Sequence, residues 1–137
     1  MNLFKALEIS GSALKAERMR AEVVASNMAN AETTRTPQGG PYKRKMVVFE
    51  SQKPSFASAL EGAGVKISQV VEDKSAPVRR FEPNHPDADA QGYVSYPDIN
   101  PIAEMTDLMS ASRAYELNAS AVQATKSMIQ QTLELLK

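Results

Sequence analysis

Apolar residues recur every seven positions along the C-terminal third of the chain. Alternate steps of three and four residues, interrupted only by Ser112 and Lys126, select Met105, Leu108, Tyr115, Ala119, Val122, Ile129, Leu133 and Leu136. A seven-residue repeat that continues for so long favours a left-handed coiled coil over an ordinary surface helix. The pattern predicts one long helix from Pro101 to Lys137, with Asn100 as its N-cap residue.

A similar repeat occupies the N-terminal segment, with Ser10 and Glu17 as its exceptions: Leu3, Leu7, Leu14, Ala21, Val24, Met28 and Ala31. It predicts a helix that starts after Asn2 and ends near Asn30. Its weak point is Ser10-Gly11-Ser12, because glycine costs about 1 kcal/mol relative to alanine inside a helix and serine about half as much. We therefore expect this helix to depend on packing against other elements.

Residues 33–100 have a different character and hold every proline except Pro101. Three stretches predict strands, the last of them weakly: Tyr42 to Glu50, Val65 to Glu72 and Ala76 to Glu82. We divide the chain into a helical coiled-coil domain, residues 1–32 and 101–137, and a small β- and loop-rich insert, residues 33–100. A compact insert keeps its two ends close together. The expected fold is therefore mainly α, with an antiparallel coiled-coil pair of helices projecting from a small β element.

Composition narrows the range of functions. The formal net charge is zero, which argues against a general nucleic-acid or anionic-membrane binder. Cysteine is absent, so disulfides and thiolate metal sites are excluded. No apolar run approaches the roughly 20 residues that span a bilayer. Apolar residues near the N-terminus alternate with charged ones such as Lys5 and Glu8, so we expect no cleaved secretory signal of the usual kind.

One motif has the residue types of a metal site. His85, Asp87 and Asp89 alternate along the chain, and imidazole and carboxylate ligands at this spacing could hold a divalent cation. The alternative, which we favour, is a surface loop whose side chains cap its own turns. No second histidine and no phosphate-binding or nucleophile motif is present, so we expect no catalysis, cofactor or small-molecule substrate.

Charged residues of opposite sign gather in two separate segments. Residues 33–45 hold a basic cluster of Arg35, Lys43, Arg44 and Lys45. Residues 82–98 hold an acidic cluster of Glu82, Asp87, Asp89 and Asp98. Both segments can be solvated loops. They can also be complementary, within one subunit or between neighbours, and so orient an assembly.

Small and apolar residues extend beyond a single stripe on both predicted helices, for example at Ala25, Ala29, Ala114 and Ala121. Two helices that face each other bury one stripe apiece, so the remaining residues predict further partners. We expect the helix seams to form an assembly interface that contains Leu3, Leu7, Leu14, Val24, Met28, Met105, Leu108, Tyr115, Val122, Ile129, Leu133 and Leu136.

Two segments resemble one known family. Ala-Leu-Glu-Ile-Ser at residues 6–10 and Ala-Ser-Asn-Met-Ala-Asn-Ala-Glu-Thr at residues 25–33 resemble the N-terminal signature of bacterial flagellar rod and hook proteins. Ser-Ala-Ser-Arg-Ala-Tyr-Glu-Leu-Asn at residues 110–118 resembles their C-terminal signature. The signature residues of this chain are Asn27, Ala29, Asn30, Thr33, Arg113, Tyr115 and Asn118.

The central region is similar to the proximal rod proteins of the same family. The similar stretches are Pro-Asn-His-Pro-Asp-Ala-Asp at residues 83–89, Gly-Tyr-Val at residues 92–94 and Tyr-Pro-Asp-Ile-Asn-Pro at residues 96–101. The resemblance implies a structural subunit of the rod, the drive shaft of the flagellar basal body, whose terminal helices pair as a coiled coil within a tube. It also implies export through the flagellar type III apparatus, without a cleaved signal peptide, into the periplasm.

The resemblance also implies partners. They are further copies of the chain in a helical assembly, another proximal rod protein, the next rod segment and the adaptor that joins the rod to the membrane ring. A rival hypothesis is a soluble secreted factor or chaperone whose helices bind one partner. Such a protein would form a stable one-to-one complex rather than a tube or filament.

Overall fold

The computed structural model of the protein describes residues 3–52 and 62–135. Within these residues the first and last elements along the chain are two long helices, α1 (Leu3–Ala29) and α2 (Pro101–Leu135), and the strands lie between them in the sequence. The strands pair as two antiparallel ribbons, β1 (Lys45–Ser51) with β2 (Val65–Glu72), and β3 (Val78–Phe81) with β4 (Tyr93–Tyr96). The predicted combination of long terminal helices and a small β insert is confirmed. Strand β4 is an addition that the sequence pattern does not predict.

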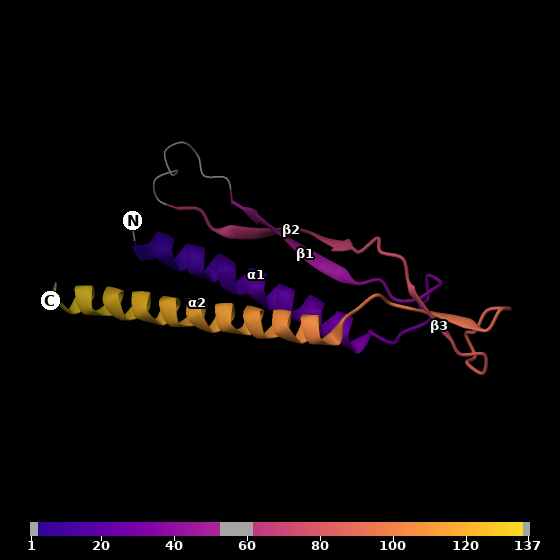
Figure 1. Cartoon of the computed structure of the whole chain (residues 1–137). Helices are drawn as coiled ribbons and strands as arrows, with labels where there is room; N and C mark the ends of the chain where they lie inside the picture. The colour runs from indigo at the N-terminus through magenta and orange to yellow at the C-terminus, as the bar shows by residue number, and fades with distance from the viewer. Residues whose placement is uncertain (1–2, 53–61, 136–137) are drawn as a thin grey trace.

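The two helices lie side by side and run antiparallel, so both chain ends lie at the same end of the molecule (Figure 1). Two contacts fix their register: Arg20 pairs with Asp107, and Asn27 bonds to Glu104. Because α2 has 35 residues and α1 has 27, the last turns of α2 extend beyond the start of α1 (Figure 1). The paired arrangement agrees with the prediction, whereas coiled-coil packing stays a prediction.

The β1–β2 ribbon lies along α1, on the side away from α2 (Figure 1). In the described part of the chain, no Cα atom of either strand comes within 8 Å of α2. The molecule is therefore layered as ribbon, α1, α2, and only the β3–β4 ribbon lies beyond the helix ends. The expectation that the helices project from the whole β element is wrong. A two-stranded ribbon is marginally stable alone, so it packs against a helix.

Ser12 holds the far end of the β1–β2 ribbon against α1. Its hydroxyl donates to the carbonyl of Ile9 at 2.7 Å and accepts the N–H of Val65 at 3.0 Å. A Cβ atom at Gly64 would lie only 2.7 Å from the Ser12 Oγ, so glycine permits this close approach. The segment that the sequence marks as a weak part of the helix is therefore also the point where the ribbon docks.

Buried apolar side chains are few in residues 3–52 and 62–135. They are Ala16, Val24, Val94, Tyr96 and Ala111. The two alanines lie on α1 and α2, where small side chains permit close approach of the helices, and Val94 and Tyr96 belong to β4. So small a core is typical of a chain that gains much of its stability from partners. Neither helix, over its described length, is long and apolar enough to cross a membrane.

Candidate assembly interface

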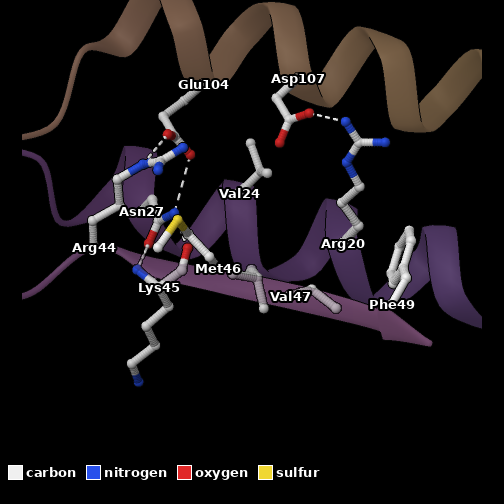
Figure 2. Close-up of a pocket in the computed structure, with 11 residues that line it drawn as sticks. Arg20, Val24, Asn27, Arg44, Lys45, Met46, Val47, Phe49, Glu104 and Asp107 are labelled. Atoms are coloured by element: carbon white, nitrogen blue, oxygen red, sulfur yellow. Dashed lines mark hydrogen bonds and ion pairs between the residues drawn. The ribbon is translucent and has the colours of Figure 1, made fainter. Parts of the chain in front are cut away.

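Asn27 uses its whole carboxamide to join three elements (Figure 2). Its Nδ2 donates to the main-chain oxygen of Lys45 at 2.8 Å, and its Oδ1 accepts the main-chain N–H of Lys45 at 2.9 Å, as a neighbouring strand would. The same Nδ2 donates to Glu104 Oε2 at 3.0 Å, and the same Oδ1 accepts the Tyr42 hydroxyl at 3.1 Å. A carboxamide offers two donors and two lone pairs, so its full capacity is used.

Glu104 lies in the first turn of α2 and is only 1% exposed, although it carries a carboxylate. Its Oε1 accepts a hydrogen bond from Arg44 Nε at 2.6 Å, while Oε2 accepts the bond from Asn27 (Figure 2). A buried carboxylate without partners would cost several kcal/mol. The contacts therefore tie the start of α2 both to α1 and to the residue that precedes β1. We call Asn27, Arg44 and Glu104 the polar junction.

A second ion pair lies close to the polar junction on the same two helices. Arg20 bonds to Asp107 and also contacts Glu17 at 3.4 Å. The hydrogen bond to Asp107 is the main reason that the pKa of Arg20 is raised above its ordinary value, so Arg20 stays positively charged. Between the two ion pairs lies a groove of about 340 Å³. Figure 2 shows its apolar lining, which includes Val24, Met46, Val47 and Phe49.

The face of α2 that meets α1 coincides only in part with the predicted seam, at Leu108, Val122 and Ile129. Its buried and half-buried residues include Glu104, Leu108, Ala111, Asn118, Val122, Thr125 and Ile129. Met105 and Tyr115 of the predicted seam are instead 53% and 43% exposed, and Leu133, in the last turns beyond the start of α1 (Figure 1), is 57% exposed. Small side chains at Ala111 and Thr125 permit close helix contact, which the bulkier neighbours on the predicted stripe would prevent. Leu136 lies outside the described residues.

The predicted seam residues of α1 are more buried than those of α2. Val24 is buried, and the other predicted positions are half-buried: Leu3, Leu7, Leu14 and Met28. The reason is that α1 is covered twice, by α2 on one side and by the β1–β2 ribbon on the other. The role of these residues in subunit contacts stays a prediction.

The outer surface of α2, in contrast, has apolar side chains that no described element covers. Its exposed large apolar residues are Ile102, Met105, Met109, Tyr115, Leu117, Met128, Leu133 and Leu135. They extend over the length of the helix, which has a covered face toward α1 alone. Extended exposed apolar surface on a soluble protein marks an interaction site. We refer to these residues as the outer α2 face.

The motif of His85, Asp87 and Asp89, for which the sequence favours a self-capped loop over a metal site, forms the turns of the loop between β3 and β4. The Nδ1 of His85 accepts the N–H of Asp87 at 3.1 Å, and Asp89 Oδ1 accepts the N–H groups of Gln91 and Tyr93 at 2.9 Å. The bond from Tyr93 is the largest cause of a pKa of Asp89 below its ordinary value. Within the described ranges, no three His, Asp or Glu side chains gather as a metal site would require. The geometry is that of a self-capped loop.

The basic and acidic segments meet at one point within the subunit. Arg35 lies 3.5 Å from Asp87, and the Thr34 hydroxyl donates to the same carboxylate at 2.7 Å. Arg44 of the basic segment pairs with Glu104 of α2 instead. Complementarity within one subunit is thus realised at Asp87 and joins the chain after α1 to the β3–β4 loop.

The signature residues divide into internal and surface positions. Asn27 belongs to the polar junction. Asn30 closes the end of α1, because its Nδ2 donates to the Ser26 carbonyl at 2.9 Å and its Oδ1 accepts the Thr33 hydroxyl at 3.1 Å. Asn118 donates to the Ala114 carbonyl at 2.8 Å on the α1-facing side of α2. The remaining signature positions are exposed: Ala29, Arg113 and Tyr115.

Sequence reasoning missed Arg44, Glu104 and Ser12 as structural contacts. A usable signal existed for Glu104, because Glu104, Ala111, Asn118 and Thr125 recur every seven residues as an alternative stripe of small and polar side chains. No local pattern marks Ser12, whose partner Val65 lies in a distant strand.

Comparison with known proteins identifies the class. A family model described as flagella basal body rod protein matches residues 7–35, and one described as flagellar basal body rod FlgEFG protein C-terminal matches residues 90–135. These segments contain most of α1 and all of the described α2. Both matched segments assign the chain to the class of flagellar basal-body rod proteins.

Full-length relatives narrow the class to one family. The flagellar basal-body rod protein FlgC of Bacillus subtilis is 44% identical, with 100% of both chains covered. The protein of the same name from Borreliella burgdorferi is 36% identical over 100% of this chain and 99% of the relative, and that of Escherichia coli O6:H1 is 41% identical over 98% of both. The chain belongs to the FlgC family of flagellar basal-body rod proteins. It is a structural rod subunit of the basal body, and the family is not one of enzymes.

Proposed function

We propose that this protein is a subunit of the proximal rod and assembles through its terminal helices into the tubular drive shaft that transmits torque. The observation that carries the proposal is the outer α2 face, which leaves large apolar side chains such as Leu117 in water in the single subunit. Neighbouring subunits would cover this face and share the load over many helix contacts. In this proposal coiled-coil packing forms between subunits as well as within them.

The proposed neighbours follow from the family. They are further copies of the chain in a helical assembly, FlgB-like and FlgF-like rod proteins, and a FliE-like adaptor to the membrane ring. The flagellar type III export apparatus would deliver the chain to the periplasmic rod without a cleaved signal peptide. Nucleic acid, cofactors and small-molecule substrates have no part in this function.

Each region of the chain has a distinct part in the proposal. The helical domain, residues 1–32 and 101–137, supplies the assembly contacts, including the predicted seam residues that the single subunit leaves exposed. The insert, residues 33–100, supplies the contacts at the periphery of the rod. Exposure of Met105, Tyr115 and Leu133 supports this division, because about half of each residue's surface stays in water within the subunit.

The substitution Leu117→Asp tests the proposal. Leu117 is 72% exposed, so the new carboxylate stays in water in the isolated subunit and changes its free energy of unfolding by less than about 0.5 kcal/mol. In a packed rod the same carboxylate would be buried, at a cost of several kcal/mol. We expect a non-motile strain whose isolated basal bodies lack a complete rod, while the subunit is still exported.

Leu117→Met is the matched control, because it keeps an apolar side chain of similar volume. It should swim normally. Normal swimming by the Leu117→Asp strain would contradict the proposal. A purified chain that forms only a one-to-one complex with a single partner, and never a tube with rod proteins, would favour the secreted-chaperone hypothesis instead.

A further inference from the structure

We propose that the polar junction selects the register of α2 against α1, and that it does so as a determinant of specificity rather than as a source of stability. Asn27 contacts Glu104 of α2 and both main-chain groups of Lys45 at the start of β1. One side chain therefore fixes the positions of both α2 and the ribbon relative to α1. The effect of this register on rod assembly rests on the proposed rod function.

The rest of the helix contact distinguishes registers less well. The α1-facing residues of α2 repeat every seven positions, as Glu104, Ala111, Asn118 and Thr125 show. If α2 moved by one heptad, about 10.5 Å along its axis, Ala111 would lie opposite Asn27 and Asn118 would lie opposite Ala16. Ala111 is smaller than Glu104, whose place opposite Asn27 it would take, so no bulky apolar side chain opposes the shift at the level of the junction. Heptad sequences are prone to such alternatives, and a buried polar residue is a known means of excluding them.

A one-heptad shift would leave the junction incomplete. Asn27 would lose its carboxylate acceptor, and Arg44 would lose the partner that lies 2.6 Å from its Nε. Glu104 would move beyond the end of α1 and would have neither Asn27 nor Arg44 as a partner. Arg20 would face Ala114 instead of Asp107, since the same shift applies there. A half-satisfied buried network is costly, so the polar contacts penalise the shifted register far more than the apolar contacts do.

Register selection can be separated from stability by removing both charges at once. The desolvation of a buried ion pair offsets much of its attraction, so its replacement by apolar residues of similar volume is often neutral or stabilising. The double variant Arg44→Met/Glu104→Leu should therefore remain folded. One N–H of Asn27 loses its acceptor, and the discrimination between registers falls to what the Arg20–Asp107 pair still provides.

Engineered disulfides report the register on a chain that has no cysteine of its own. Arg20 lies opposite Asp107, so Ala16, one turn back, lies opposite Ala111, one turn on. The pair Ala16→Cys/Ala111→Cys should form a disulfide in the native register, and Ala16→Cys/Asn118→Cys should form one after a one-heptad shift. Each pair is placed in the purified full-length chain with and without the double variant, and urea unfolding is measured alongside.

Arg18→Met/Glu22→Leu is the matched control. It removes an arginine–glutamate pair of the same chemistry, but one that is exposed and lies within α1 alone. In the parent and control chains we expect only the native cysteine pair to form a disulfide. In the Arg44→Met/Glu104→Leu chain we expect either pair to form one, with a urea midpoint close to that of the parent. Its strain should lose motility, while the control strain keeps it.

Several results would overturn the proposal. One is a double variant that forms only the native disulfide, because the register would then be set elsewhere. Another is a double variant that unfolds at clearly lower urea, because the junction would then act through stability. A parent chain without the native disulfide also overturns it, since the register would not be set within the subunit. Lost motility in Leu117→Asp is independent of these outcomes, so failure here and failure of the rod function are distinguishable.

Discussion

Asn27 on α1 donates a hydrogen bond to Glu104 on α2 across 3.0 Å, and each of the two side chains is only 1% exposed. The residues are 77 positions apart in the chain. One lies in the segment that matches the N-terminal rod family model and the other in the segment that matches the C-terminal one. This buried polar contact therefore joins the two family segments, beside the partly buried Arg20–Asp107 pair, and Arg44 and the start of β1 are also attached to it.

Asn27→Asp should destabilise the subunit strongly although it barely changes the side-chain volume. The aspartate has no N–H groups for Lys45 and Glu104, and it places a second carboxylate next to Glu104 in a buried site. We expect a loss of about 3 kcal/mol or more in the free energy of unfolding, measured by urea denaturation at neutral pH. Asn30→Asp is the control, because Nδ2 of Asn30 donates only to the Ser26 carbonyl, and it should cost about 1 kcal/mol. Equal losses in both variants would contradict the role assigned to Asn27.

Substitutions at the neighbouring positions Gly11 and Ser12 of α1 should change the free energy of unfolding in opposite directions. Ser12→Ala removes the acceptor of the Val65 N–H and should cost about 1–2 kcal/mol, with faster hydrogen exchange at the start of β2. Gly11→Ala should stabilise the subunit by about 1 kcal/mol, because a Cβ atom there meets nothing within 4 Å. If Ser12→Ala left the exchange of Val65 unchanged, the ribbon would not depend on this hydroxyl.

The sequence pattern predicted both helices, because apolar periodicity and the caps are local properties. The N-cap is an example, since Asn100 Oδ1 accepts the N–H of Ile102 at 3.0 Å. The pattern selected only part of the α1-facing side of α2, because it weighs large apolar side chains such as Leu108, whereas close helix contact also uses small ones such as Ala111. Nor could it place the β1–β2 ribbon, because Ser12 and Gly64 meet only after the chain has folded back on α1. Contacts between distant residues leave no period in the sequence.

Acid should loosen the loop between β3 and β4. The pKa of Asp89 lies below its ordinary value, mainly because the Tyr93 N–H donates to the carboxylate, with further contributions from Gln91 and Arg79. A lowered folded-state pKa means that the carboxylate stabilises the loop above its unfolded pKa of about 3.9, and that this contribution is lost as the pH falls through the folded value. The amide shift of Tyr93 should therefore begin to change below about pH 4. Asp89→Asn should remove this dependence, and an identical titration in the variant would assign it to another group.

The last turns of α2 should become ordered on assembly. Every residue from 130 to 135 is exposed, including Leu133 at 57% and Leu135 at 87%, because α2 extends beyond the start of α1. A helix end without packing partners opens at almost no free-energy cost, so these amides should exchange rapidly in the isolated subunit. Residues 108–118 lie in the part of α2 that pairs with α1 and provide the internal control, since their helical amides should be protected both before and after assembly. In isolated rods the exchange of residues 130–135 should slow to the level of the control, because a neighbouring subunit covers Leu133 and Leu135. Rapid exchange that persists in the rod would show that these leucines stay in water and that the outer α2 face ends before them.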